Sequence, residues 1–301
     1  MAAILVRTTP ARPLLSALTL VVAVFLAVIP SGAATASTTP CDTPLTTAEK
    51  ITITELSDIG ALTGSSLRRL EQAVDRHRRI TEILVRHRDL RGVFGLGLDA
   101  VERAAVLPLQ RDPAAFDDPE WAHRISLELL SRFLRAVHAE FTGAPTEPHW
   151  AHYFGLSRRC ELSPARVAMA GYNAHLTVDL AYSVAAVGST AANAADYFRI
   201  VDAIAQQGAL IVERTKAVYG GDLGPLWRFY FLGEGLDAAL GPGVATGPLL
   251  RLADAGANVL IFGNGLALRD PAQAPVVAAE IDALWRGLDL AFEALSGLGG
   301  L

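Results

Sequence analysis

The sequence is poor in lysine, in cysteine and in charge of either sign. Of its 301 residues 19% are charged, lysine occurs only at positions 50 and 216, and 26 basic residues face 31 acidic ones, for a net charge of −5. Proteins that follow nucleic-acid phosphates carry the opposite excess, so this balance argues against a nucleic-acid partner. Of all residues 51% are hydrophobic, which is enough for one large domain with a sizeable core.

Several catalytic motifs are also missing. The sequence has no G-x-S-x-G motif, no glycine-rich phosphate loop and no dinucleotide-binding glycine pattern. These absences argue against serine hydrolases, P-loop enzymes and Rossmann-type dehydrogenases. There is no internal repeat and no convincing alternation of apolar and polar residues, so the sequence does not predict β-strands.

The N-terminus has the layout of a secretory signal peptide. Arg7 and Arg12 precede an apolar run over residues 13–29, and Ala34-Thr35-Ala36 offers a small-x-small cleavage site. We expect residues 1–36 to be a signal peptide and the mature protein to be secreted, with no stable membrane span. The alternative is an uncleaved anchor, although the run barely reaches the length of a bilayer span. Residues 37–45 then form a Ser/Thr/Pro linker, and residues 46–301 form the folded domain.

The two cysteines are Cys41, just after the expected cleavage site, and Cys160. Export places both in an oxidising compartment, where two lone cysteines normally pair. The sequence therefore predicts a Cys41–Cys160 disulfide.

Apolar residues recur with helical spacing along the domain. Thr46-x-x-Glu49 has the spacing of a capping box, and Gly263-Asn264-Gly265 is expected to interrupt or end a helix. The sequence predicts an all-α fold, a single-domain multi-helix bundle around one buried apolar central helix. Expected helices follow residue 46 and span 67–84, 98–107, 119–141, 149–154, 163–187, 196–219, 226–240, 248–268 and 275–295.

The expected central helix, residues 163–187, carries the candidate site. It begins with Ser163 as N-cap and Pro164 at the first helical position. Within an otherwise apolar stretch, His175 and Asp179 stand four residues apart, which places them on one helix face. Buried polar side chains must be paired with each other, with neighbouring helices or with a ligand. This pair is therefore the first candidate site.

Two interpretations of the pair remain open. A histidine and a carboxylate at this spacing can bind a divalent metal ion such as zinc, with Asp202 as a third ligand and with His149 and His152 approaching from a preceding turn. His152 would then serve as an acid or base. Alternatively, His175 and Asp179 hydrogen-bond each other and only fix helix packing.

Three further polar positions have alternatives of their own. Asn173 suits an interhelical hydrogen bond or contact with a ligand. The turn with His149 and His152 follows a proline-rich loop, where an exposed pair without a catalytic role is as consistent as a ligand pair. His77 and His87 lie among arginines and are expected to be solvated.

The segment Ala170-Gly171-Tyr172-Asn173-Ala174-His175-Leu176-Thr177-Val178-Asp179-Leu180 resembles the G-x-N-A-H-I-x-x-D-L signature of a secreted or cytoplasmic actinobacterial family of unknown function. The resemblance extends over residues 65–290 and implies an all-α fold without an assigned activity. The A-H-x-x-x-D-L part is also similar to a helix of the zinc-dependent phospholipase C and single-strand nuclease superfamily. The second histidine motif and the tryptophan ligand of that superfamily are absent here.

These observations support two hypotheses about function. The first is a metal-dependent hydrolase of a small ester or phosphoester. The second is a non-enzymatic secreted binding protein in which the histidine and aspartate side chains are structural.

Overall fold

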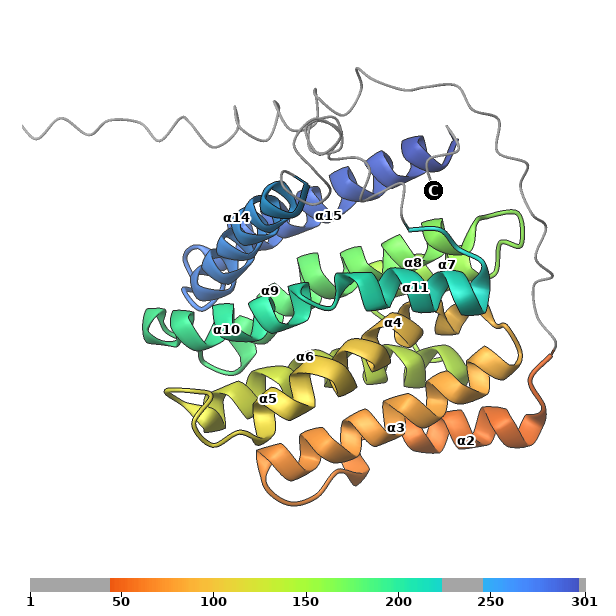
Figure 1. Cartoon of the computed structure of the whole chain (residues 1–301), viewed down its shortest axis with the longest axis horizontal. Coiled ribbons are helices and arrows are strands. Elements are labelled where there is room, and N and C mark those ends of the chain that lie inside the picture. Colours follow the sequence, from red (N-terminus) through yellow and green to blue (C-terminus); the bar gives the residue numbers. More distant parts are fainter. Residues whose placement is uncertain (1–43, 224–245, 298–301) are drawn as a thin grey trace, which may run out of the picture. The chain divides into compact units, whose positions relative to one another are not determined.

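A computed structural model describes residues 44–223 and 246–297 of the chain, and every regular element in these two ranges is a helix (Figure 1). The all-α prediction is therefore confirmed. The α-helices are α2 Thr47–Ser57, α3 Ser66–Arg86, α4 Val93–Val101, α5 Leu107–Arg111, α6 Pro119–Thr142, α7 Pro148–Ser157, α8 Pro164–Asn173, α9 Leu180–Ala186, α10 Ala194–Ala205, α11 Gly208–Tyr219, α14 Thr246–Ala267 and α15 Ala274–Gly297. Shorter 3₁₀ turns are η1 Ile59–Ala61, η2 Leu90–Gly92 and η5 Ala191–Asn193, and two π-helical turns are η3 Glu102–Val106 and η4 Ala174–Asp179.

Local capping signals set several helix starts. At α2 the predicted capping box is present: the Glu49 backbone N–H donates to the Thr46 hydroxyl, and the Glu49 carboxylate accepts from the Thr46 backbone N–H. Asp118 caps α6 and Ser163 caps α8, each ahead of a proline at the start of the helix. Each such cap satisfies a backbone donor that the helix itself leaves free.

The core consists of two clusters of buried apolar side chains. The first lies among α2, α3, α4, α6, α7 and α8 and includes Phe94 and Trp150. The second lies among the start of α6 and helices α9, α10, α14 and α15, and includes Trp121 and Trp285. The π turn η4 joins them, since its first residue, Ala174, belongs to the first cluster and Val178 to the second. Asp179 ends this turn and therefore lies where the two cores meet.

The predicted central helix is present, but it is not a regular α-helix. α8, η4 and α9 follow one another without a break, and the Leu180 N–H donates to the carbonyl of His175, five residues back. This i→i+5 bonding widens the turn. Residues four apart, such as His175 and Asp179, consequently do not stack as they would in an α-helix.

Two other helix predictions are corrected. Residues 196–219 do not form one helix, because α10 ends at Ala205 and α11 begins at Gly208. Gln206, Gln207 and the low helix propensity of Gly208 interrupt the apolar pattern there. Conversely, α14 continues through Gly263 and Gly265 to Ala267. Gly265 packs tightly on α9, which favours a residue without a side chain at that position.

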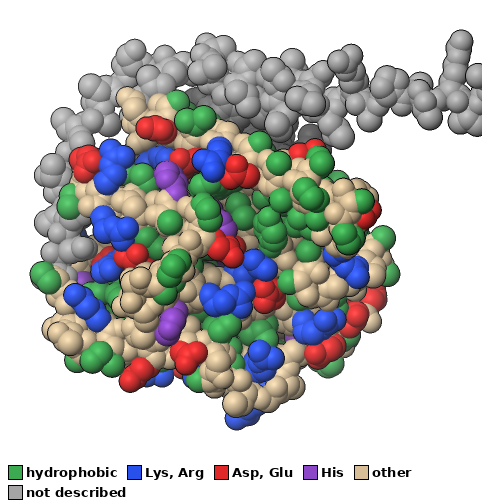
Figure 2. All heavy atoms as spheres, turned by 180° about the vertical axis from the view of Figure 1, so that it is seen from behind, with side chains coloured by type: hydrophobic (Ala, Val, Ile, Leu, Met, Phe, Trp, Pro, Cys, Tyr) green, Lys and Arg blue, Asp and Glu red, His purple; other side chains and the backbone are tan. Residues whose placement is uncertain are grey.

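The surface mixes charges of both signs. On the face shown in Figure 2, basic and acidic side chains are interspersed rather than gathered by sign. Several pair along one helix, as when Arg78 contacts both Asp75 and Glu82. Exposed pairs of this kind contribute only ~0–1 kcal/mol each.

Some predictions fall outside the described residues. They are the signal peptide 1–36, all but the end of the 37–45 linker, the helix at 226–240, and Cys41 with its predicted disulfide to Cys160. Among the residues that are described, no helix is long and apolar enough to cross a membrane.

Candidate metal centre

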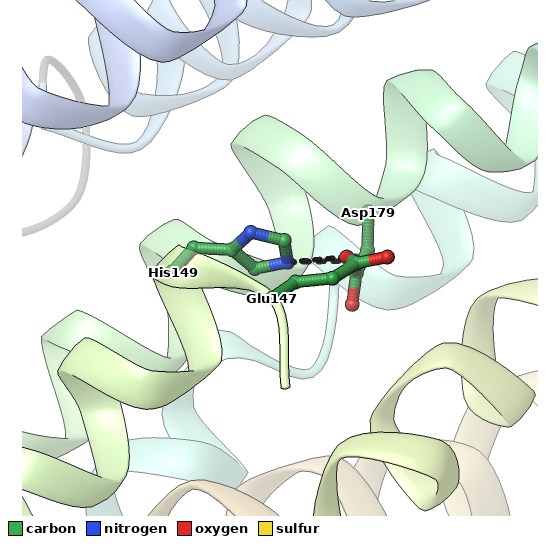
Figure 3. A group of neighbouring side chains, drawn as sticks. All are labelled: Glu147, His149 and Asp179. Atoms are coloured by element: carbon green, nitrogen blue, oxygen red, sulfur yellow. Dashed lines mark hydrogen bonds and ion pairs between the residues drawn. The ribbon is translucent and has the colours of Figure 1, made fainter. Parts of the chain in front are cut away.

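Two carboxylate side chains and one histidine side chain lie close together where α7 begins and η4 ends. His149 Nε2 lies 3.0 Å from Asp179 Oδ1 and 3.3 Å from Glu147 Oε2. The ligand atoms of the three residues all lie within 4.8 Å of one another. Figure 3 shows Glu147 reaching beneath the His149 ring toward the carboxylate of Asp179.

The start of α7 explains how two of these residues come together. Glu147 is the N-cap residue in extended conformation, and Pro148 occupies the first turn. His149 follows within that turn and points into the core, where its side chain is buried. The side chain of Glu147 is 60% exposed, whereas that of Asp179 is fully buried. The group thus extends from the interior to the surface.

Asp179 is held on both of its oxygens. Trp150 Nε1 donates to Oδ2 over 2.9 Å, while Oδ1 faces His149. The Trp150 ring is itself fixed by aromatic contacts with Phe94 and Phe133. One carboxylate oxygen is therefore oriented by the protein, and the other is directed at the histidine and Glu147.

His175 lies beside this group but is not hydrogen-bonded to it. Its Nδ1 is 3.9 Å from Asp179 Oδ2 and, although buried, has no hydrogen-bond partner among the described residues. Burial, assisted by the proximity of His77 and His149, lowers the pKa of His175 to about 3. The interpretation in which His175 and Asp179 satisfy each other is therefore wrong. Asp179 is satisfied instead by His149 and Trp150.

His152 belongs to a neighbouring polar cluster. Its Nε2 lies 2.8 Å from Asp289 on α15, and the buried guanidinium of Arg166 donates to the other oxygen of Asp289 at 2.8 Å. Burial alone would raise the pKa of Asp289, but the hydrogen bonds and charges of His152 and Arg166 outweigh it and lower that pKa. His149 and His152 both contact the ring of Trp285 edge-on. The two clusters are thus adjacent through one tryptophan.

Two predicted site residues lie apart from the group. Asn173 makes an interhelical hydrogen bond, from Nδ2 to the Trp285 carbonyl at 2.8 Å, and its Oδ1 accepts from Thr177. Asp202 is exposed on α10. It lies two residues from the buried Ile200 and therefore points to another side of that helix. The structure does not bring Asp202 to Asp179.

Two expectations of exposure were wrong. His149 is buried and is the centre of the group, because η4 and Trp285 cover it. His77 is also buried, with Nδ1 2.7 Å from the carboxylate of Glu102. In α3, His77 lies three residues from both Val74 and Ile80, which are buried, so its position on the apolar face outweighs its arginine neighbours.

The sequence reasoning missed Glu147 and Asp289 altogether. Glu147 stands two residues before His149, a separation that gives no helical-face signal because Glu147 lies outside the helix. Asp289 lies on a helix far along the chain. Only the packing of α15 on α8 brings it to His152 and Arg166.

Two of the separations within the group are close to those found around a small divalent ion. Two ligand atoms about 2.1 Å from one tetrahedral ion lie roughly 3.4 Å apart. His149 Nε2 lies 3.3 Å from Glu147 Oε2, which is close to this value. It lies 3.0 Å from Asp179 Oδ1, so these two atoms would move slightly apart when an ion binds. One imidazole and two carboxylates are ligands that zinc accepts.

The fold and this group define an all-α protein with a histidine and carboxylate group that could hold a metal ion. A family model described as a family of unknown function (DUF5995) matches residues 70–232, and the chain belongs to this family. The matched range includes Glu147, His149 and Asp179. No curated protein and no solved structure matches the chain. The similarity to the zinc-dependent phospholipase C superfamily gains no support from these comparisons.

Proposed function

We propose that Glu147, His149 and Asp179 bind one divalent metal ion, with zinc as the best fit. The observation that carries this proposal is the convergence of three ligand atoms within 4.8 Å, contributed by both sides of the contact between α7 and η4. Trp150 supports it, because a donor on the second oxygen of a ligating carboxylate fixes the carboxylate's orientation.

The activity that this site supports best is hydrolysis of a small ester or phosphoester. A divalent ion with three protein ligands keeps a position for water and lowers the pKa of that water toward ~7. The exposure of Glu147 opens the group to the surface, where a substrate can reach it. His152, which is half-exposed and hydrogen-bonded to Asp289, would serve as the acid or base.

A non-enzymatic binding protein is the second candidate, and one observation favours it. Both oxygens of Asp179 already accept hydrogen bonds from protein donors, so the group is satisfied without an ion. In that case His149 and Asp179 fix the packing of α7 on η4, and Glu147 is an exposed side chain that binds no metal ion.

Zinc titration of Glu147→Gln tests the metal proposal without disturbing the core. We expect the metal-stripped parent to bind one equivalent of zinc in calorimetry, with stabilisation on heating, and the variant to bind at least about tenfold more weakly because a charged ligand is lost. Glu161→Gln is the matched control, since Glu161 is a similarly exposed glutamate on a different loop. Equal zinc affinity in the parent and in Glu147→Gln would exclude the site.

Hydrolysis of bis(4-nitrophenyl) phosphate and 4-nitrophenyl acetate tests the activity separately. We expect turnover by the zinc-loaded parent, loss of turnover in chelator and in Glu147→Gln, and a reduced rate in His152→Gln. Zinc binding at Glu147 without turnover of either ester would retain the metal site and rule out the hydrolase proposed for these substrates.

We also propose that the protein is exported, with residues 1–36 removed and Cys41 paired with Cys160. The arrangement of the N-terminal sequence supports this proposal. Intact-mass analysis of the secreted protein should show a chain that begins at Ser37 and takes up alkylating reagent only after reduction. Two alkylated cysteines in the denatured, unreduced protein would contradict the disulfide.

A further inference from the structure

A second candidate site is an apolar cavity of about 100 Å³ lined by residues of α3, α4, α6, α8, α10, α11 and the two π turns. Its walls are mostly aliphatic and aromatic side chains, including Phe94, Val106, Leu130, Ile200, Ile204 and Ile211. None of the residues of the metal group lines it.

Four polar side chains also line this cavity: Glu102, Ser126, Tyr172 and His175. The Ser126 hydroxyl accepts a hydrogen bond from Gln110. The Tyr172 hydroxyl and His175 Nδ1 are buried and have no hydrogen-bond partner within the described residues. Glu102, in contrast, is paired with His77. Buried polar atoms without partners are uncommon in folded proteins, and each one calls for an explanation.

The backbone around the cavity is unusual at two of these residues. Glu102 opens the π turn η3, and His175 lies in the π turn η4. Insertions of this kind are rare and occur frequently at functional sites, because they displace side chains from the regular helical register. Here both insertions present a polar side chain to the same apolar space.

The cavity lies next to a second hollow, with which it shares part of its wall. This hollow, of about 90 Å³, shares Leu129, Leu176 and Ile200 with it. Leu176 is 40% exposed, so it forms the rim. A molecule entering past Leu176 would meet mainly apolar side chains of α6 and α10, with the Ser126 hydroxyl among them, before it reached Tyr172 and His175.

We propose that this cavity binds a small neutral molecule with a single hydroxyl on an apolar body, such as a phenol or a short alcohol. An apolar cavity of roughly 150 Å³ holds one benzene molecule, so the two adjacent hollows together suit one ring or a short chain. The hydroxyl would hydrogen-bond Tyr172 and His175. A carboxylate is disfavoured because no lysine or arginine of the described residues lines either hollow and Glu102 faces the space.

Fluorine NMR titration of the mature protein with 4-fluorophenol tests this proposal. We expect a saturable shift of the probe, binding of fluorobenzene at least tenfold weaker because it lacks the hydroxyl, and no binding of 4-fluorobenzoate. Tyr172→Phe should weaken 4-fluorophenol about fivefold and leave fluorobenzene unchanged. Since the Tyr172 hydroxyl has no partner within the described residues, this variant should fold normally.

A second pair of variants separates the cavity from the surface. Leu176→Trp should block entry and abolish binding of 4-fluorophenol, whereas Leu290→Trp, at an exposed leucine on α15, should bind it like the parent. Glu147→Gln should also bind it like the parent, which keeps this inference independent of the metal site. Absence of saturable binding to the parent, or unchanged binding in Leu176→Trp, would overturn the proposal.

Discussion

Asp179→Ala is expected to lower the free energy of unfolding of the metal-stripped protein by about 3–5 kcal/mol, the usual cost of removing one partner of a buried charged or strongly polar pair. The carboxylate is fully buried and accepts from both His149 and Trp150. Its removal leaves the buried Trp150 N–H without an acceptor, leaves His149 with only the exposed Glu147 as a partner, and opens a cavity where the two cores meet. Urea unfolding followed by circular dichroism measures the change.

Two further variants serve as comparisons for the loss of stability in Asp179→Ala. Asp179→Asn keeps the shape and one acceptor oxygen for Trp150, so it should cost clearly less than the alanine variant. Asp202→Ala removes an exposed carboxylate and should change stability by less than about 0.5 kcal/mol. Unfolding curves of Asp179→Ala and the parent that superimpose would show that the hydrogen bonds to Asp179 contribute nothing.

Gly265→Ala should destabilise the protein by about 2–3 kcal/mol, a typical cost of overpacking. A Cβ atom at Gly265 would lie 2.4 Å from the Cβ of Val184 and 2.7 Å from the carbonyl oxygen of Ala181. Both atoms belong to α9, and the backbone oxygen cannot rotate away. α14 would have to move off α9, and the second core cluster would loosen.

Gly263→Ala is the matched control, because Gly263 lies in the same helix and is exposed, and a Cβ atom added there would meet no described atom within 4 Å. It should stabilise the protein by up to ~1 kcal/mol, the helix-propensity difference between alanine and glycine. Thermal unfolding of both variants checks the pair. Equal shifts in the same direction would contradict the close packing of α14 on α9.

The fold was predictable where the signals are local. The capping box at Thr46 and the cap-proline pairs at Asp118 and Ser163 are contained within four residues, and each marks a helix start that the structure shows. The break at Gln206 was missed because the apolar spacing on either side of it looks continuous. Neither π turn has a sequence signature, since the extra residue is accommodated by packing with other helices.

The site was only half predictable. A polar pair in an apolar helix marked Asp179 as buried and paired, but an α-helical register assigned it to His175. Its actual partners, His149 and Trp150, lie about 30 residues away and are brought to it by the packing of α7 against η4. Tertiary contacts of this kind leave no spacing that a single sequence reveals.

The central claim is that Glu147, His149 and Asp179 hold one metal ion. Zinc-edge anomalous diffraction from crystals of the metal-loaded protein tests it most directly, because it locates the ion independently of any activity. The account predicts one strong peak about 2.1 Å from His149 Nε2 and from a carboxylate oxygen of both Asp179 and Glu147. An anomalous map with no peak at these three side chains, in protein that has taken up zinc, would contradict it.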